Sequence, residues 1–174
     1  LELTNAYNVL AGGGVLAQPF LIRGVAAVDD SLLEVNLPTS SRVIPEAMTY
    51  LVTSALQGVV LRGTASSLSA YGYTGPAAGK TGTTNDYKDA WFIGYTPHLA
   101  MGVWVGLDQA DTTALSGASG ALPIFGSVIA EALGQHYQLG FVEPEGIEHA
   151  ACSTGDEVFL VGTVPDACTG GTFT

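Results

Sequence analysis

Positive charge is scarce in this sequence. Its 174 residues include only 5 lysines and arginines against 16 aspartates and glutamates, which gives a formal net charge of −11. Proteins that bind nucleic acid need basic patches that neutralise phosphates, so we expect no nucleic-acid partner. The net charge identifies no substrate either, because an acidic surface also serves solubility.

Long apolar runs are missing as well. No run approaches the 18 residues of a membrane-spanning helix, and no secretory signal opens the sequence. We therefore expect no membrane contact from this segment. The first residues already follow a helical pattern, which we interpret as a start within a domain, so the missing signal says nothing of a longer parent protein.

The patterns of common cofactor and metal sites are also absent. Gly79-Lys80 has Thr74 at the position where a phosphate-binding P-loop needs glycine. Asp108 and Asp111 have no glycine or glutamate in the register of a calcium loop. We expect no cofactor and no metal.

Cysteine occurs only twice, as Cys152 and Cys168. A disulfide between them would close a loop of about 15 residues and stabilise the fold by roughly 3 kcal/mol in the chain-entropy model. Such a bond requires an oxidising compartment. Two unpaired thiols are the alternative.

The residues that are present indicate one enzyme-like domain with a sizeable core. Apolar residues make up 47% of the chain and charged residues only 12%, which is not the composition of a disordered tail. Apolar periodicity predicts helices over residues 1–11, 45–62 and 122–133, and strands over 20–28, 32–35, 90–95, 99–107 and 158–161. The polar stretch 38–41 is expected to be a connection. The near-continuous apolar character of 90–95 and 99–107 predicts inner strands of a sheet that helices cover on both faces.

The stretch from Ala78 to Thr84 reads as a strand that faces a ligand. Glycine inside a strand marks a close approach of a ligand or another backbone, and Gly82 lies between two threonines. Strand alternation directs the side chains of Thr81 and Thr83 to one face, where two hydroxyls beside an ammonium suit a carboxylate. The same alternation places Lys80 on the opposite face. Either the strand is locally twisted, or Lys80 serves a neighbouring group from behind.

The triplet Lys80-Thr81-Gly82 resembles the third motif of the serine penicillin-recognising enzymes. The longer run over residues 79–97, together with 103–106, is similar to the C-terminal half of the transpeptidase domain of class A penicillin-binding proteins. A bare triplet occurs by chance in many chains, whereas the longer run is far more specific. The resemblance extends from Leu3 to about Ile147.

This resemblance implies an α+β fold, namely part of the penicillin-binding transpeptidase fold, with an antiparallel sheet and helices packed on its faces. Residues 1–140 would be the C-terminal part of the transpeptidase domain. Residues 141–174, which contain no lysine or arginine, would be an acidic C-terminal extension.

The family's nucleophile motifs are absent from this sequence. The lysines are Lys80 and Lys88, and the residues three positions before them are Ala77 and Asn85, so no S-x-x-K exists. No serine has an asparagine two positions later, so S-x-N is absent too. The nucleophile is therefore expected outside this polypeptide, and the chain alone is expected to be inactive.

The resemblance implies roles for the residues of the motif strand. Lys80 and Thr83 would act in catalysis, and residues 80–84 (Lys80, Thr81, Gly82, Thr83 and Thr84) would bind substrate. Thr81 and Thr83 would hold a carboxylate, and the Thr83 N–H would be half of an oxyanion hole, which needs preorganised donors. Gly82 would let the substrate lie against the strand.

Residues 62–65, Arg62-Gly63-Thr64-Ala65, are similar to the family's segment that leads into this strand. They either border the cleft or form an ordinary helix C-terminus with Arg62 near the helix dipole.

The implied partners are peptidoglycan stem peptides, β-lactam antibiotics and the N-terminal remainder of the same protein. The implied location is the periplasmic side of the bacterial inner membrane, with a membrane anchor upstream of this segment. Three alternatives remain open: a D,D-carboxypeptidase or β-lactamase of the same superfamily, a non-catalytic interaction module, and a structural α/β domain with an accidental triplet.

Overall fold

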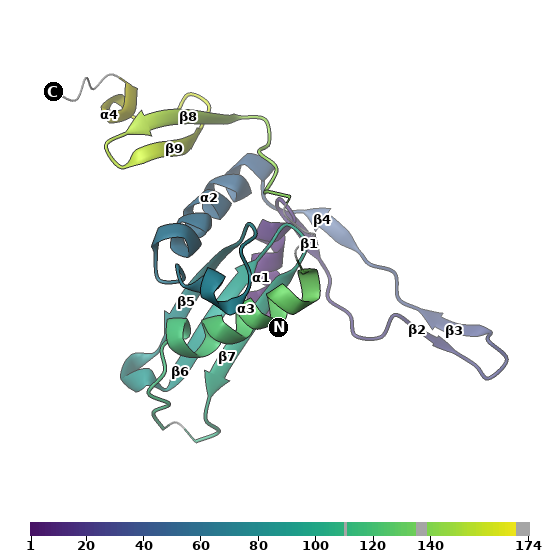
Figure 1. The fold of residues 1–174 in the computed structure, drawn as a ribbon. Coiled ribbons are helices and arrows are strands. Elements are labelled where there is room, and N and C mark those ends of the chain that lie inside the picture. The colour runs from purple at the N-terminus through teal and green to yellow at the C-terminus, as the bar shows by residue number, and fades with distance from the viewer. Residues whose placement is uncertain (110, 135–138, 170–174) are drawn as a thin grey trace.

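A three-stranded antiparallel sheet forms the centre of the molecule in the computed structural model, which describes residues 1–109, 111–134 and 139–169 (Figure 1). Its strands are β5 (Ala78–Thr83), β6 (Asp89–Tyr95) and β7 (Ala100–Gly106), in that spatial order. The three strands predicted for these stretches are confirmed. The tip of the predicted extension, residues 170–174, lies outside the described residues.

Helices cover both faces of this sheet. The pairing register places Phe92 beside Val103 on one face, where Phe92 meets Phe125 of α3 (Leu122–Leu133) edge to face at 4.7 Å. On the other face, Gly102 lies against Thr4 of α1 (Glu2–Ala11), so closely that a Cβ atom would not fit. The predicted cover of helices on both faces is thus confirmed, but only β6 is an inner strand of the described sheet, and the prediction of an inner strand over 99–107 is wrong because β7 pairs with β6 alone.

The hydrophobic core lies mainly between the sheet and α3. Its buried members come from β6, β7, α3 with the residue before it, and the segment before β5, and they are Ala65, Leu68, Tyr73, Ala77, Phe92, Val103, Ala121, Leu122, Phe125 and Ile129. Much of α3 is apolar, and Pro123 in its first turn costs no hydrogen bond there. The core thereby fixes the sheet on which β5 is held.

Helix α2 (Glu46–Arg62) lies alongside β5 and is joined to the sheet by a buried hydrogen bond of 2.8 Å between the hydroxyls of Thr53 and Tyr95. After α2 the chain makes the short 3-10 helix η1 (Leu68–Tyr71), which packs on α3. The sequence showed only a serine cluster here.

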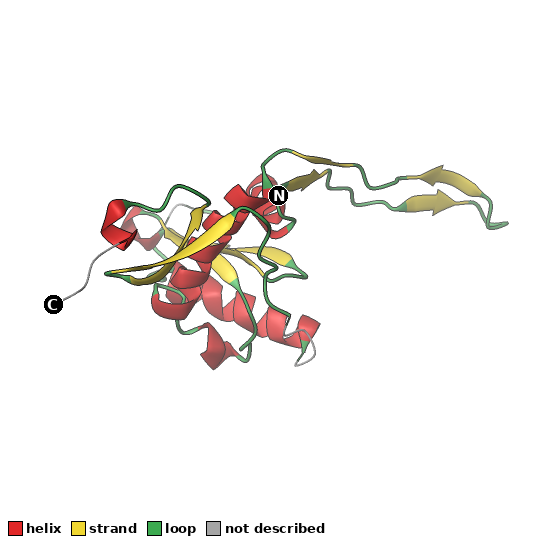
Figure 2. Cartoon of the chain, turned by 90° about the horizontal axis from the view of Figure 1, so that it is seen from above, coloured by secondary structure: helices red, strands yellow, loops and turns green. Residues whose placement is uncertain are grey.

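An arm of two small antiparallel ladders projects from the body (Figures 1 and 2). At its base β1 (Val15–Ala17) pairs with β4 (Ser40–Arg42), and further out β2 (Gly24–Ala26) pairs with β3 (Leu32–Val35). The predicted strand over 20–28 is therefore too long, because only its middle pairs. The prediction of a connection over 38–41 is wrong for its second half. Residues 40 and 41 have polar side chains, but their backbone pairs with β1 as part of β4.

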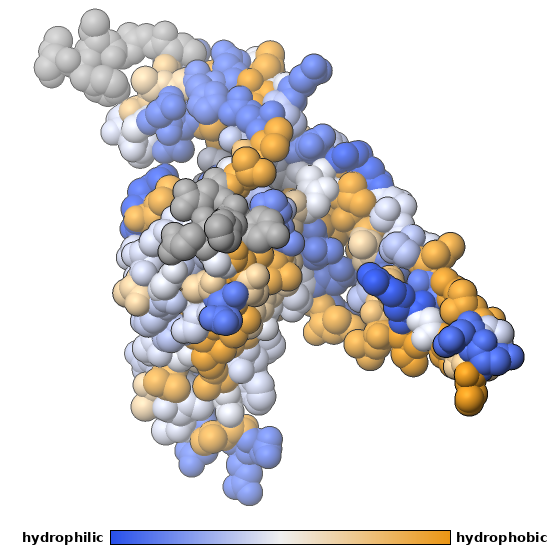
Figure 3. All heavy atoms as spheres, turned by 45° about the vertical axis from the view of Figure 1, so that its right-hand side comes forward, coloured by the Kyte–Doolittle hydropathy of each residue, from blue (hydrophilic) through white to orange (hydrophobic). Residues whose placement is uncertain are grey.

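The tip of the arm turns at residues 29–31. The Asp29 carboxylate accepts hydrogen bonds from the Ser31 N–H at 3.1 Å and the Ser31 hydroxyl at 2.6 Å, and these bonds lower the pKa of Asp29. Asp30 takes the left-handed conformation with φ 63°. Hydrophobic side chains such as Leu21, Val28 and Leu33 are exposed along the arm (Figure 3).

The C-terminal extension forms a hairpin of β8 (Ile147–Cys152) and β9 (Gly155–Leu160), followed by α4 (Asp166–Thr169). The predicted strand over 158–161 matches only the second half of β9, and β8 was not predicted, because the charged residues of both strands hide their strand character. A disulfide joins Cys152 to Cys168, with 4.5 Å between their Cα atoms. None of the helices in the described residues is long and apolar enough to cross a membrane.

Candidate functional site

Strand β5 is paired on one side only. Beyond it no further strand follows in the described part of the chain, so β5 is an edge strand. The Thr84 N–H donates to the Asp89 carbonyl at 3.0 Å, in line with the register of β5 and β6. Antiparallel ladders alternate bonded and non-bonded residues, so the N–H and C=O groups of Thr81 and Thr83 point away from β6, towards the open edge.

A hollow of about 340 Å³ lies at this edge. Its lining consists of the motif residues together with side chains of α1 and β6, namely Leu3, Tyr7, Lys80, Thr81, Gly82, Thr83, Thr84, Trp91 and Ile93. Ligand sites are typically concave and largely apolar, with a few convergent polar groups, and this hollow has that composition.

Lys80 reaches the open edge by bending around the strand. Lys80 is paired with Ile93, so its side chain leaves the strand on the face opposite to Thr81, as strict alternation requires. The ammonium nevertheless donates to the Thr81 carbonyl at 2.9 Å. No local twist is needed, because the long side chain brings its charge back to the edge. Within the described residues no carboxylate forms an ion pair with Lys80, so its charge is available to a ligand.

The hydroxyls of Thr81 and Thr83 are each held by another element. Thr81 Oγ1 lies 2.6 Å from Thr64 Oγ1, in the turn after α2. Thr83 Oγ1 accepts a hydrogen bond from the Gly117 N–H at 3.0 Å. The segment 62–65 therefore ends the helix, as one interpretation had it. Thr64 also contacts the motif strand, but none of these four residues lines the hollow.

Thr84 lines the hollow, but its hydroxyl is used in the turn that follows. Thr84 Oγ1 accepts from the Asp89 N–H at 2.8 Å and donates to the Asp89 carboxylate at 3.1 Å. The other oxygen of that carboxylate accepts from the Trp104 indole N–H at 2.9 Å. This network closes the turn between β5 and β6, which contains Asp86 and Tyr87 in left-handed conformations.

Gly117 is a site residue that the sequence interpretation missed. It lies in η3 (Gly117–Ala121), a single π-turn before α3, and a Cβ atom on it would come within 2.3 Å of the Trp91 carbonyl oxygen and 2.6 Å of the Gly82 carbonyl oxygen. Only glycine can therefore lie this close to the β5–β6 ladder. The glycine-rich cluster of residues 117–120 was the available signal.

The tyrosine beside the hollow is uncharged. Burial raises the pKa of Tyr7, whose ring packs on Tyr95 at 6.4 Å between centroids. Burial likewise raises the pKa of Tyr95 to about 12. Neither phenol ionises near neutral pH, so among the described residues that line the hollow Lys80 alone is charged.

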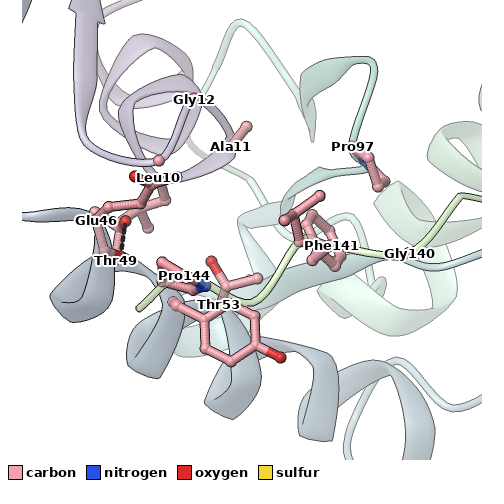
Figure 4. Close-up of a pocket in the computed structure, with 13 residues that line it drawn as sticks. Leu10, Ala11, Gly12, Glu46, Thr49, Thr53, Pro97, Gly140, Phe141 and Pro144 are labelled. Atoms are coloured by element: carbon pink, nitrogen blue, oxygen red, sulfur yellow. Dashed lines mark hydrogen bonds between the residues drawn. The ribbon is translucent and has the colours of Figure 1, made fainter. Parts of the chain in front are cut away.

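A second cavity of about 210 Å³ lies between α1, α2 and the linker that leads to the extension (Figure 4). Its threonine hydroxyls are already engaged: Thr49 donates to the Glu46 carbonyl at 2.7 Å, and Thr53 bonds to Tyr95. Phe141 of the linker packs on Tyr95 at 5.6 Å. This cavity lies where the extension packs against the body of the protein. Its charged lining residue, Glu46, is paired with Arg42, so the cavity has no counterpart of the Lys80 ammonium.

Sequence comparisons with known proteins match most of this chain. The family model described as "Penicillin binding protein transpeptidase domain" matches residues 1–130. Penicillin-binding protein 1A of Aquifex aeolicus is 41% identical over 127 residues, which are 72% of this chain and 17% of that protein. Penicillin-binding protein 1B of Escherichia coli is 37% identical over 171 residues, which are 94% of this chain and 20% of that protein.

The fold comparison is independent of these identities. A crystal structure of penicillin-binding protein 1A from Haemophilus influenzae matches with a TM-score of 0.86 at 23% identity, covering 94% of this chain and 32% of that chain. This likeness confirms the α+β fold expected from the sequence. The chain spans about a fifth of the length of the curated relatives named above.

Proposed function

This chain belongs to the penicillin-binding protein transpeptidase family, of the class A type that includes the 1A and 1B proteins, and we propose that it forms one wall of the active site of a peptidoglycan D,D-transpeptidase. The observation that carries this proposal is the open edge of β5. There Lys80, Thr81 and Thr83 line one hollow, with the Lys80 ammonium at the Thr81 carbonyl and the Thr83 N–H directed outward.

The two hydroxyls would bind the terminal carboxylate of a stem peptide, or the carboxylate of a β-lactam. The Thr83 N–H would donate to the oxygen that becomes negative when the carbonyl is attacked, because a preorganised donor stabilises that charge most where it develops. Lys80 would supply the positive field and support proton transfer among groups of the other wall. Gly82 would leave room for the substrate beside the strand.

The nucleophile would be a serine from the N-terminal remainder of the protein, since this sequence has no S-x-x-K. Its oxygen would attack the peptide bond between the two terminal D-alanines, and the last D-alanine would leave with a proton on its amine. An amine of a neighbouring stem would then displace the serine oxygen and restore the hydroxyl. With a β-lactam, ring opening would leave the acyl-serine in place. Residues 1–140 would belong to this domain, and 141–174 would be an extension on the periplasmic side of the membrane.

A carboxypeptidase or β-lactamase would share this wall and differ in using water as the acceptor. A non-catalytic module would lack a companion wall altogether. Intact mass measurement of the complete protein with a labelled penicillin, under native and then denaturing conditions, tests these possibilities. A stable label on a serine outside this chain supports the transpeptidase or a carboxypeptidase, rapid loss of the label indicates a β-lactamase, and no label indicates a module.

Gly82 provides the matching test on this chain. A Cβ atom there would lie 3.2 Å from the Cβ of Trp91, so a valine would fill part of the hollow. In the complete protein Gly82→Val should abolish acylation by penicillin. Gly140→Val is the control, because a Cβ atom at Gly140 meets nothing within 4 Å. Acylation of Gly82→Val at the wild-type rate would contradict the assignment.

A further inference from the structure

The hydroxyl of Thr64 makes a short contact with the motif strand from a distant part of the sequence. Thr64 and Thr81 are 17 residues apart, and their Oγ1 atoms are 2.6 Å apart, a typical distance for a strong O–H···O hydrogen bond. Thr81 lines the hollow at the edge of β5, whereas Thr64 does not. A ligand in the hollow would therefore touch Thr81 alone, and Thr64 could act on it only through Thr81.

The turn that carries Thr64 is fixed on both sides. The N–H groups of Gly63 and Ala65 both donate to the Val59 carbonyl of α2, each at 3.1 Å. The Ala65 side chain is fully buried in the core. A Cβ atom on Gly63 would come within 2.8 Å of the Val59 Cα, so the turn fits closely against its helix. Thr64 is therefore held in place by its neighbours rather than by its contact with Thr81.

The direction of the proton in this bond matters for anion binding. A hydroxyl has one proton to donate and can accept two hydrogen bonds. Thr83 accepts from the Gly117 N–H, which can only donate, so the Thr83 proton is left for a ligand. In the pair of Thr64 and Thr81 either oxygen can be the donor. When Thr81 donates to a carboxylate, Thr64 must donate to Thr81.

We propose that Thr64 is a positioning residue, which donates its hydroxyl proton to Thr81 and so turns the Thr81 proton towards the carboxylate of the substrate. The inference rests on the proposed function of the β5 edge. Chains of hydrogen bonds polarise one another, so a Thr81 hydroxyl that accepts from Thr64 is a stronger donor. Both threonines of the strand then have the same arrangement, in which a second element donates to the hydroxyl and the hydroxyl donates to the anion.

The test compares Thr64→Val, which keeps the shape and removes the hydroxyl, with Thr64→Ser, which keeps the hydroxyl. Acylation of the complete protein is measured with a penicillin and with its methyl ester, which has no free carboxylate. We expect Thr64→Val to slow acylation by the penicillin about 3- to 10-fold, the effect of one hydrogen bond, and to leave acylation by the ester unchanged. Thr64→Ser should restore the wild-type rate.

Two further variants complete the design. Thr74→Val is the matched control, because Thr74 is also exposed but makes no side-chain hydrogen bond within the described residues. If Thr64 acts only through Thr81, the double variant Thr64→Val with Thr81→Val should be no slower than Thr81→Val alone.

Each failure can be recognised. Equal slowing of the penicillin and the ester by Thr64→Val would overturn the inference, since it would show a purely structural role. An unchanged penicillin rate would overturn it as well. A wild-type protein that neither compound acylates would refute the proposed function itself, and the inference with it.

Discussion

Replacement of Gly117 by alanine tests how the η3 turn supports the motif strand. A Cβ atom at this position would lie 2.3 Å from the Trp91 carbonyl oxygen, whereas ordinary contacts begin at 3.4 Å. The turn must therefore lift by about 1.1 Å, because Trp91 and Gly82 are held in the β5–β6 ladder and cannot give way. A shift of this size breaks the 3.0 Å bond from the Gly117 N–H to Thr83.

The expected result is a loss of both activity and stability. A misplacement of about 1 Å at a binding group can reduce rates by up to about 100-fold, so we expect acylation of the complete protein by a labelled penicillin to slow by about 10- to 100-fold. Overpacking of this kind also costs about 1–3 kcal/mol of stability, which thermal unfolding measures.

The control for this experiment is Gly140→Ala, which has the same effect on the unfolded chain but adds a Cβ atom in open space. Gly140 borders the second cavity and not the hollow beside β5. If Gly117→Ala were acylated and unfolded like Gly140→Ala, the close approach of η3 to the ladder would be refuted.

Two further predictions concern the C-terminal extension. Replacing Cys152 and Cys168 by serine should destabilise the extension by roughly 3 kcal/mol in the chain-entropy model and speed its limited proteolysis, while penicillin acylation stays unchanged; equal proteolysis with and without the disulfide would contradict this. The hydrogen bond to Glu143 at 2.7 Å raises the pKa of His149, and Asp156 on the other ring nitrogen adds to this effect. Protonated His149 therefore stabilises the extension fully below the unfolded pKa of about 6.5. This stabilisation is lost as pH rises through the higher folded pKa. The extension of His149→Gln should therefore be cleaved faster than that of the wild type at pH 5.5 and at the same rate at high pH, which limited proteolysis at the two pH values measures. A variant with the wild-type pH dependence would disprove the role of His149.

The sequence predicted the elements that depend on local pattern. Apolar periodicity located the helices over 45–62 and 122–133, the inner strand β6 and the outer strand β7, because each of these elements buries one face or both in the core. The composition of residues 78–84 indicated a strand that faces a ligand. The strand predicted over 32–35 matches β3, but β1, β4 and β8 were missed, since these strands are short and largely exposed, and exposed strands carry no hydrophobic alternation.

Lys80 illustrates why the candidate site could be predicted only in part. Alternation correctly placed its Cα on the face opposite to Thr81, and from this the sequence left two explanations open. The structure shows a third, in which the side chain bends around the edge to the Thr81 carbonyl. The flexible stem of lysine allows this, and strand periodicity contains no information about it.

The sequence by itself determined which strand bears the candidate chemistry and that the nucleophile motifs are missing from this chain, because both depend on the order of neighbouring residues. The tertiary structure alone decided that β5 is an edge strand, that Thr64 and Gly117 hold its two hydroxyls, and that its hollow opens beside α1. These are contacts between residues far apart in the chain. They depend on how α2, η3 and the sheet pack around one core, and no local pattern specifies that packing.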